Sequence, residues 1–400
     1  MAMKPLPGAE TGGRTAGKTH LLADPLKRKQ QFFALNGLRF LGAFWILVFH
    51  TSIHVGRLNA LEFVQPLINE GPLAMTLFFV LSGFVLAHTY RQFADQHAYH
   101  FFFAARLARL YPVYIFVGVV TVWQLRHGLA DFTLVVQHGV LGAFLLAGIL
   151  LVIFLFVLQA WIPPLFVVWN FGGTWAISVD AFLYLVFPKL RMHLASLGTK
   201  LLRLVVYGMP LLMLAMLFGL LASQQSNDDS SARLFYVLPI FRLPEFVFGI
   251  GGFILFVERG RDLRLLTIAG SLLSVLLGAC IWTKSLPGLT NWGWLAVIPF
   301  MCAFVLSLKL EAPEFVKRLV NYAGRVSYCV YMAQFATIPV VEHFKMDMSM
   351  QATWALTISS TLVFAVFMYH FVEVLAYRKT FSLSLLLFRK LASLKGKLER

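Results

Sequence analysis

Runs of predominantly apolar residues recur along the whole chain, each about 17 to 25 residues long, which is the length an α-helix needs to cross a bilayer. A transmembrane β-barrel would instead show ten-residue segments of alternating polarity, so the pattern predicts an all-α, polytopic helical membrane protein. With 59% hydrophobic and 13% charged residues, the chain has too few polar side chains to cover a water-soluble domain. The runs lie at about 33–54, 72–90, 108–125, 134–159, 165–188, 201–222, 235–257, 265–283, 292–310, 326–343 and 353–376.

Lysines and arginines are concentrated in short segments between these runs, so the net charge of +16 indicates membrane topology and not nucleic-acid binding. Under the positive-inside rule, each such segment is expected in the cytoplasm together with both termini. These basic segments are 91–109, 189–203, 258–264, 309–325 and 378–400.

The chain divides into three parts on composition. Residues 1–31 are rich in Gly, Thr and Lys without periodicity, and we expect a disordered cytoplasmic tail. Residues 32–377 contain all the apolar runs and form the membrane domain. Residues 378–400 are a basic cytoplasmic tail whose mixture of Leu, Phe, Lys and Arg is typical of a helix that lies on a membrane surface.

The charge pattern and the number of runs disagree by one crossing. Eleven crossings that start inside would leave the C-terminus outside, and the disagreement lies between Arg109 and Lys189, where three runs occur. The run at 165–188 contains Asn170 and Asp180 and follows two prolines. Irregular backbone at membrane depth is tolerated where it lines a cavity. We therefore predict about ten spans and one broken or re-entrant segment at 165–188.

The first apolar run carries Arg39 near its start and His50 near its end. These residues are eleven positions apart, so on a helix they share one face and lie about 16 Å apart along the axis. A charge in hydrocarbon costs at least about 2.5 to 3.5 kcal/mol on insertion scales, so we expect a polar cavity against this face. His50 is a candidate general base toward a hydroxyl group, or else a buried histidine bonded to a neighbouring helix.

A metal site at His50 is not predicted. His54 lies one turn further on and would complete a pair of ligands, but no third ligand with matching spacing follows. The cysteines, widely spaced inside apolar runs, indicate packing and no disulfide framework. They are Cys280, Cys302 and Cys329.

Other charged residues also fall inside or at the ends of apolar runs. Asp180 must be paired or protonated there, so it is a candidate to orient the imidazole of His50, or else an ion-pair partner between helices. Arg242 and Glu245 present the same two alternatives.

Arg106 and Arg109 share a helical face at the expected cytoplasmic boundary, where we also place Arg39. They are candidates to bind the phosphates of a nucleotide-bearing donor, or else simple interface anchors. The chain contains no glycine-rich phosphate loop, no GxSxG elbow and no HExxH motif.

Several of these stretches, taken in order, resemble the acyltransferase-3 family of integral membrane O-acyltransferases, which includes bacterial O-antigen and exopolysaccharide acetylases. Arg39 and His50, with ten residues between them, match the family's Arg-x10-His signature within LNGLRFLG. The further matches are FFVLSGFVL at 78–86, RLARLYPVY at 106–114, TWAISVDAFLYLVFP at 174–188, LPEFVFG at 243–249, GRVSYCVYMAQF at 324–335 and FVE at 371–373.

The resemblance implies transfer of an acyl group, commonly acetyl, from cytoplasmic acyl-CoA to a hydroxyl of a cell-envelope or exported polysaccharide or glycolipid. The expected location is the bacterial inner membrane. The expected partners are the bilayer, acyl-CoA as donor substrate, the acceptor and polysaccharide-assembly machinery. No permanently bound cofactor and no nucleic acid are expected.

Within that reaction we predict three catalytic residues, His50 as general base, Arg39 positioning the donor or supporting developing negative charge, and Asp180. Arg106 and Arg109 are predicted to bind the donor. Ser82 is either a transient acyl acceptor or a small residue that lets helices approach. The supporting polar residues are Ser82, Ser178, Arg242, Glu245, Tyr328 and Glu373.

The chain departs from the family's usual pattern at three positions. Asn36 stands where the family often has Asp, and Asp180 stands where it often has Glu. Gln334 stands where a histidine is often found, so no proton-transfer role is assigned to it. No hydrolase-like domain is expected after the last span, as in the stand-alone form of the family.

Two other functions fit the same residues. A transporter or lipid flippase would use Arg39, Asp180 and Glu245 as a pathway without covalent chemistry. An inactive relative would serve as a structural partner in polysaccharide assembly. The presence of both Arg39 and His50 favours the enzyme.

Overall fold

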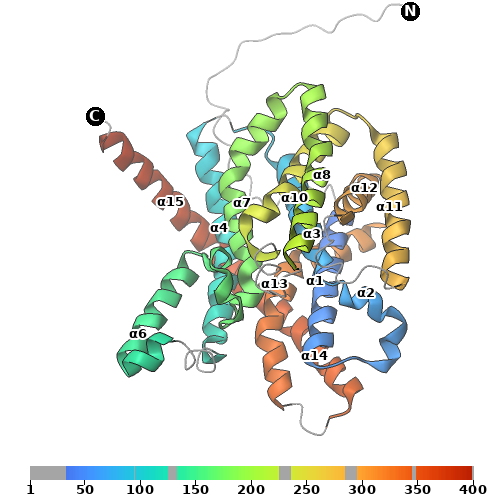
Figure 1. Cartoon of the computed structure of the whole chain (residues 1–400). Helices are drawn as coiled ribbons and strands as arrows, with labels where there is room; N and C mark the ends of the chain where they lie inside the picture. The colour runs from blue at the N-terminus through green and yellow to red at the C-terminus, as the bar shows by residue number, and fades with distance from the viewer. Residues whose placement is uncertain are drawn as a thin grey trace, which may run out of the picture.

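The computed structural model describes residues 33–93, 95–124, 133–224, 236–283, 295–344 and 348–398. The predicted N-terminal tail, residues 1–31, lies outside these ranges. Within them the protein is all-α, as the sequence predicts, and no strand occurs. Figure 1 shows the helices gathered into one bundle.

The elements are, in chain order, α1 (Phe33–His54), η3 (Asn59–Val64), α2 (Gln65–Asn69), α3 (Leu73–Thr89), α4 (Gln96–Val120), η4 (Val122–Gln124), α6 (Thr133–Leu155), η5 (Gln159–Trp161), η6 (Pro163–Val167), α7 (Phe171–Ser196), α8 (Thr199–Gln224), α10 (Pro239–Gly252), η7 (Phe253–Glu258), α11 (Leu263–Thr283), α12 (Val297–Ser307), α13 (Glu314–Phe344), α14 (Met350–Met368), η9 (Tyr369–Val374) and α15 (Leu375–Leu398).

The membrane character of the bundle follows from the length and polarity of these helices. Seven of the described helices are long and apolar enough to cross a bilayer, or eight if Asn59–Asn69 and α3, bent by 50°, form one span. Two shorter apolar helices, Gly139–Leu155 and Val297–Ser307, accompany them. The apolar side chains of the peripheral helix α11 are exposed, among them Leu272 and Val275, as expected for a surface in contact with lipid. The protein is therefore an integral membrane protein.

Helices α3 and α10 form the centre of the bundle, where their backbones touch. A Cβ atom added to Gly83 would lie 2.3 Å from the carbonyl oxygen of Phe246, and one added to Gly249 would lie 2.2 Å from that of Val80. Small residues at such crossings let transmembrane helices pack closely, because lipid supplies no hydrophobic drive between them.

Helices α1 and α13 are the second close pair, and they position the candidate site. A Cβ atom on Gly324 would lie 2.4 Å from the Cβ of Asn36. The amide of Asn36 also donates a 2.7 Å hydrogen bond to Asn321 Oδ1. This packing places the second half of α13 beside the second half of α1.

Within the run at 165–188 the first residues are irregular, since η6 ends at Val167 and Trp169 has a φ of 51°. The rest of the run belongs to α7, one continuous helix of 26 residues with Asp180 in its interior. The irregular backbone lies just before it, in the turns η5 and η6, where Pro163 and Pro164 cannot donate helical hydrogen bonds. Helix α6 is itself kinked at Gly139, which has a φ of 55°. The discontinuity that the charge pattern requires between Arg109 and Lys189 therefore falls before α7.

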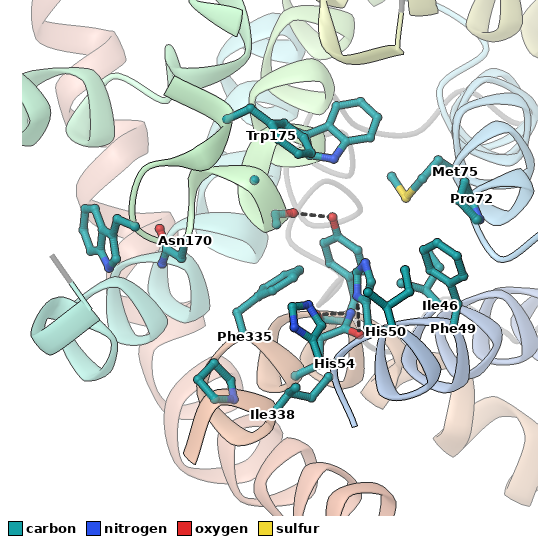
Figure 2. A pocket seen from close by; sticks show the side chains of 18 of the residues that line it. Ile46, Phe49, His50, His54, Pro72, Met75, Asn170, Trp175, Phe335 and Ile338 are labelled. Carbon is teal, nitrogen blue, oxygen red and sulfur yellow. Dashed lines mark hydrogen bonds between the residues drawn. The ribbon is translucent and has the colours of Figure 1, made fainter. Parts of the chain in front are cut away.

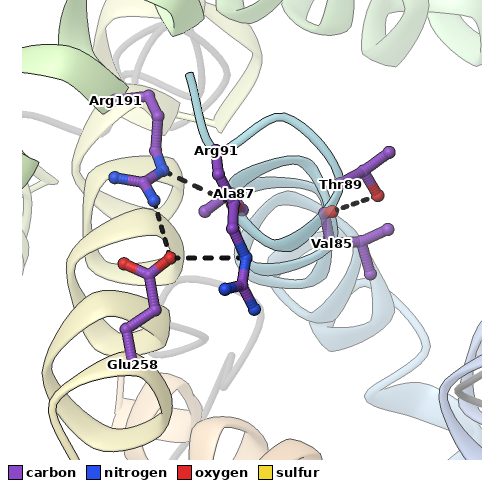
Figure 3. A network of polar contacts seen from close by, with 6 residues as sticks. All are labelled: Val85, Ala87, Thr89, Arg91, Arg191 and Glu258. Atoms are coloured by element: carbon purple, nitrogen blue, oxygen red, sulfur yellow. Dashed lines mark hydrogen bonds and ion pairs between the residues drawn. The ribbon is translucent and has the colours of Figure 1, made fainter. Parts of the chain in front are cut away.

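The basic end of the bundle is held by a polar network around Glu258 (Figure 3). Arg191 of α7 donates to Glu258 Oε1 over 2.8 Å and to the carbonyl of Ala87 over 3.3 Å. Arg91 lies 3.7 Å from the same carboxylate oxygen. The network ties together the ends of α3, α7 and η7.

The C-terminal basic segment is helical. Helix α14 continues through the π-helical η9 into α15, which packs against α4 and extends away from the bundle in Figure 1. His100 stacks on Phe388 with ring centroids 6.1 Å apart, and Arg389 bonds to His97 Nε2 over 2.9 Å.

Candidate functional site

A cavity of about 580 Å³ opens between α1, α7 and α13, and we call it the His50 cavity (Figure 2). In Figure 2, His50, His54 and Phe335 lie on one side of the cavity and Trp175 on the other. Seven aromatic side chains contribute to its wall, namely Phe49, Phe166, Trp169, Trp175, Tyr236, Tyr331 and Phe335. Its polar lining consists of His50, His54, Gln124, Asn170, Gln334 and Glu342.

The imidazole of His50 is held from α13. Its Nδ1 lies 2.9 Å from Gln334 Oε1, and its ring packs 6.1 Å from the ring of Phe335 and 5.4 Å from that of Phe49. Gln334 is 1% exposed. The sequence offers Asp180 either as a group that orients His50 or as an ion-pair partner between helices, and in the structure the group bonded to His50 is Gln334.

Proline helps to fix α13 at this level. Pro339 has no N–H, so it cannot donate to the carbonyl of Phe335 four residues earlier. That carbonyl instead accepts a 3.1 Å hydrogen bond from Gln124 Nε2. The residue next to Gln334 is thereby tied to η4.

The second group of polar residues lies near the start of α1, at the opposite end of that helix from His50. Arg39 interacts electrostatically with Arg106 and Arg109 of α4, and with Asp180 and Tyr184 of α7. We call Arg39, Arg106 and Arg109 the arginine cluster. The structure thus brings together the three arginines that the sequence places at one boundary, and it adds Asp180 to them.

Much of the hydrogen-bonding capacity of the arginine cluster is unused. In the described part of the chain, no hydrogen bond or ion pair reaches the guanidinium of Arg39 or Arg109. Arg106 donates to the Tyr90 hydroxyl over 3.2 Å and lies 5.8 Å from the Tyr184 ring centroid, while its buried Nε has no partner. Each guanidinium carries five N–H donors, so the cluster has donors available for an anion.

Glu373 and Tyr328 border the arginine cluster. Glu373 interacts with Arg109 and accepts a 3.3 Å hydrogen bond from the thiol of Cys329. The Tyr328 hydroxyl donates to the carbonyl of Leu110 over 2.9 Å and so ties α13 to α4.

The two predicted serines differ in their surroundings. Ser82 lies close enough to Tyr184 to interact with it, which places it beside the arginine cluster. Ser178 is buried, and its Oγ accepts from the backbone N–H of Ala160 over 3.4 Å. Ser178 therefore anchors the turn η5 against α7.

Arg242 and Glu245 form a closed ion pair inside the protein. Arg242 Nη1 lies 2.9 Å from Glu245 Oε1, and the two side chains are 3% and 0% exposed. Thr76 donates to the same carboxylate oxygen over 2.9 Å, and Arg242 Nε donates to the carbonyl of Tyr236 over 2.7 Å. Of the two alternatives in the sequence, the structure has the ion pair, which supports the cavity wall through Tyr236.

Asn170 is a cavity residue that the sequence did not single out. Its Nδ2 donates to Thr121 Oγ1 over 3.0 Å, and Thr121 in turn donates to a backbone carbonyl. Its side chain is 4% exposed, and its Oδ1 has no hydrogen-bond partner among the residues that the structure describes. The preceding Trp169 has a φ of 51°, a left-handed conformation that is costly for a bulky residue. Such strain beside an unused acceptor is typical of a binding site.

The His50 cavity and the arginine cluster lie at two levels of the same bundle, and none of the three arginines is among the residues that line the cavity. His50 and Arg39 lie on one face of α1, about 16 Å apart along the helix axis. Tyr331 lines the cavity and interacts electrostatically with Asp180, which belongs with the arginines.

No group of three or more His, Cys, Asp or Glu side chains that could hold a metal ion occurs in the ranges that the structure describes. His54 is paired with Glu342 at 3.8 Å, at an exposed edge of the cavity.

The fold and site together define a polytopic membrane protein with a cavity at His50 and a partly buried arginine cluster nearer the start of α1. The chain belongs to the acyltransferase-3 family, because the family model described as an acyltransferase domain matches residues 32–372.

Two curated proteins share shorter segments with the chain. "Protein 2 in picA locus" of Rhizobium radiobacter is 39% identical over 88 residues, which is 22% of this chain and 41% of that protein. "Acyltransferase MdmB" of Streptomyces mycarofaciens is 32% identical over 119 residues, which is 30% of this chain and 28% of that protein. The chain thus aligns with less than half the length of each. No solved structure matches it significantly.

Proposed function

We propose that the protein is a membrane-bound O-acyltransferase that moves an acyl group, most simply acetyl, from acyl-CoA to a hydroxyl group in the His50 cavity. The observation that carries this proposal is the position of the His50 imidazole, which lines a cavity of about 580 Å³ and is held there through Nδ1. Membership of the acyltransferase-3 family supports acyl transfer as the reaction class.

The arginine cluster is the proposed binding site for the phosphates of the donor. Arg39 and Arg109 have no hydrogen-bond partner among the described residues, and charge-assisted bonds to phosphate would use these donors. The thioester of acyl-CoA lies at the end of a long flexible pantetheine arm, remote from its phosphates. The arm would reach from the cluster along α1 toward His50, past Tyr331.

In the chemical step, His50 takes the proton of the acceptor hydroxyl as its oxygen attacks the thioester carbonyl. The carbon–sulfur bond then breaks, the CoA thiolate receives the proton, and the products are an ester and CoA. Arg39 would position the donor. Asp180 lies among the arginines, so its proposed role is to orient them and not to contact His50.

The acceptor is proposed to be a sugar hydroxyl of a polysaccharide or glycolipid. The aromatic wall of the cavity offers faces for the C–H groups of a sugar ring, and Asn170 Oδ1 is a free acceptor for a second hydroxyl. The basic ends of the helices support cytoplasmic termini, donor entry from the cytoplasm and a place in the bacterial inner membrane.

The test is transfer of labelled acetyl from acetyl-CoA by the purified protein in detergent, with candidate glycosides as acceptors. Wild type is expected to release CoA and form an O-acetyl ester, and His50→Ala is expected to lose about 10²- to 10⁴-fold in rate, the usual contribution of a general base. His193→Ala, at an exposed position near the end of α7, is the matched control. An intact thioester with every acceptor, combined with movement of a lipid-linked substrate, would favour a transporter.

A further inference from the structure

The side-chain amide of Gln334 has only one orientation that satisfies both of its neighbours. On one side it lies 2.8 Å from the backbone carbonyl oxygen of Tyr331, which can only accept a hydrogen bond. The group that faces Tyr331 is therefore Nε2, and Oε1 faces His50. The amide is buried, at 1% exposure, so bulk water cannot replace either of its hydrogen-bond partners.

The orientation of the amide decides where the imidazole carries its hydrogen. Oε1 of Gln334 can only accept, and it lies 2.9 Å from His50 Nδ1. Nδ1 must therefore be the protonated nitrogen of the neutral ring. We infer that Gln334 is a positioning residue that holds His50 as the Nδ1–H tautomer, with the lone pair of Nε2 directed into the cavity. This inference deepens the proposed function and rests on it for its catalytic meaning.

The remaining contacts of His50 leave Nε2 available. No other hydrogen bond to the ring occurs among the described residues. The nearest titratable ring, that of His54, is 6.4 Å away between centroids, and the nearest carboxylate on that side, Glu342, is paired with His54. A lone pair on Nε2 is the form that can take a proton from a hydroxyl group.

An amide differs chemically from a histidine or a carboxylate at this place. Gln334 does not titrate in the physiological range, so it can fix the direction of the Nδ1–H bond but cannot remove that proton. Its function is comparable to that of the group that holds a catalytic histidine in one tautomer in hydrolase triads. The chain thus carries a neutral orienting group where the sequence predicts an acidic one, Asp180.

The direct test is ¹⁵N and ¹³C NMR of histidine-labelled protein in lipid bilayers. The chain has eleven histidines, so the signals of His50 are assigned by their loss in His50→Asn. In wild type near neutral pH we expect Nδ1 protonated and Nε2 unprotonated. A wild-type ring with hydrogen on Nε2 alone would overturn the inference.

Two variants separate orientation from packing. Gln334→Leu removes the acceptor, so a mixture of both tautomers is expected. Gln334→Glu keeps an oxygen acceptor toward Nδ1 and should keep the Nδ1–H form, although it loses the N–H that the Tyr331 carbonyl accepts. The control is Gln65→Leu, which removes a buried amide of α2. That amide bonds to Ser52, which lies on α1 as His50 does, without contacting His50. The variant should leave the His50 signals unchanged. An unchanged tautomer in Gln334→Leu would show that Gln334 does not set it.

The catalytic consequence is measured separately. Gln334→Leu should lower kcat of acetyl transfer about three- to tenfold, in keeping with one lost hydrogen bond, with KM for acetyl-CoA unchanged. Gln334→Glu should restore most of kcat. If wild type shows the Nδ1–H tautomer but neither the Gln334 variants nor His50→Ala alter transfer, the inference about the tautomer holds and the proposed general-base function of His50 fails. The failure of the inference and the failure of the proposed function are therefore distinguishable.

Discussion

The pair Arg242–Glu245 and the arginine cluster are two sets of charged side chains in one helical bundle, the first buried and the second partly buried, and they are built in opposite ways. In the pair, the guanidinium meets a carboxylate and a backbone carbonyl, and the carboxylate also accepts from Thr76. In the cluster, three guanidiniums face the carboxylates of Asp180 and Glu373 through space, without a hydrogen bond or ion pair to either in the described structure.

We propose that this difference separates a structural site from a binding site. A buried pair whose groups are bonded to each other has nothing to offer a ligand, and breaking it leaves an uncompensated charge. Like charges held together with unused donors repel one another until an anion arrives. The sequence left a functional and a structural alternative open for each set, an ion pair being the structural one for Arg242 and Glu245 and interface anchoring for Arg106 and Arg109.

The largest effect is expected from opening the closed pair. Glu245→Ala leaves the guanidinium of Arg242 buried and unpaired, so the free energy of unfolding should fall by about 3–5 kcal/mol. The measurement is unfolding in mixed micelles followed by circular dichroism.

Two further variants calibrate that result. Glu314→Ala, which breaks an exposed pair with Arg318, should cost less than about 1 kcal/mol. The double variant Arg242→Met with Glu245→Leu should recover much of the loss, because no buried charge remains. Equal losses in all three variants would contradict a closed buried pair.

The opposite result is expected in the arginine cluster. Arg109→Ala removes one of several like charges, so stability should hardly change, while KM for acetyl-CoA should rise about 10- to 100-fold through the loss of charge-assisted bonds. Arg318→Ala, at an exposed position, is the control for a general change in charge. If Arg109→Ala unfolds the protein as Glu245→Ala does, the cluster is structural and the contrast between the two regions fails.

The close contact between α3 and α10 extends the comparison to a region that is held together by packing and not by charge. Gly249→Ala would place a Cβ atom 2.2 Å from a backbone oxygen that cannot move independently, so a loss of about 1–3 kcal/mol in unfolding free energy is expected. Gly208→Ala in α8, where a Cβ meets nothing within 4 Å, is the matched control and should be neutral or slightly stabilising. A destabilised Gly208→Ala would mean that alanine is poorly tolerated for another reason.

The sequence predicted the helical membrane fold and the shared face of Arg39 and His50, because apolar run length and helical period depend only on local spacing. It did not predict that Gln334 bonds His50, since those residues are 284 positions apart and meet only through the packing of α1 on α13. Asp180 was predicted near His50. Its direction depends on the rotation of α7 about its axis, which sequence spacing alone does not define.

The smallest effect is expected at Asp262, outside the membrane, where the ion pair with Arg203 is partly exposed to water. Arg203 donates to both carboxylate oxygens over 2.7 Å, and Tyr207 donates to one of them over 2.9 Å. The hydrogen bond from Arg203 is the main cause that holds the pKa of Asp262 below its ordinary value of 3.8. A lowered pKa means that the pair's contribution to stability is present above pH 3.8 and is lost as the pH falls through the native-state value.

Asp262→Asn tests this contribution without disturbing the backbone, because Asp262 has a φ of 59° and asparagine also tolerates that conformation. The variant should unfold at a slightly lower temperature than wild type at pH 7, and the difference should shrink in high salt, since Arg203 is 42% exposed. The gap should also narrow as the pH falls below 3.8 and through the lowered native-state pKa of Asp262, where wild type loses the same charge. If Asp262→Asn lost as much stability as Glu245→Ala, or if its loss did not depend on salt, then exposure to water would not weaken the Arg203–Asp262 pair, and the comparison with the buried pair would fail.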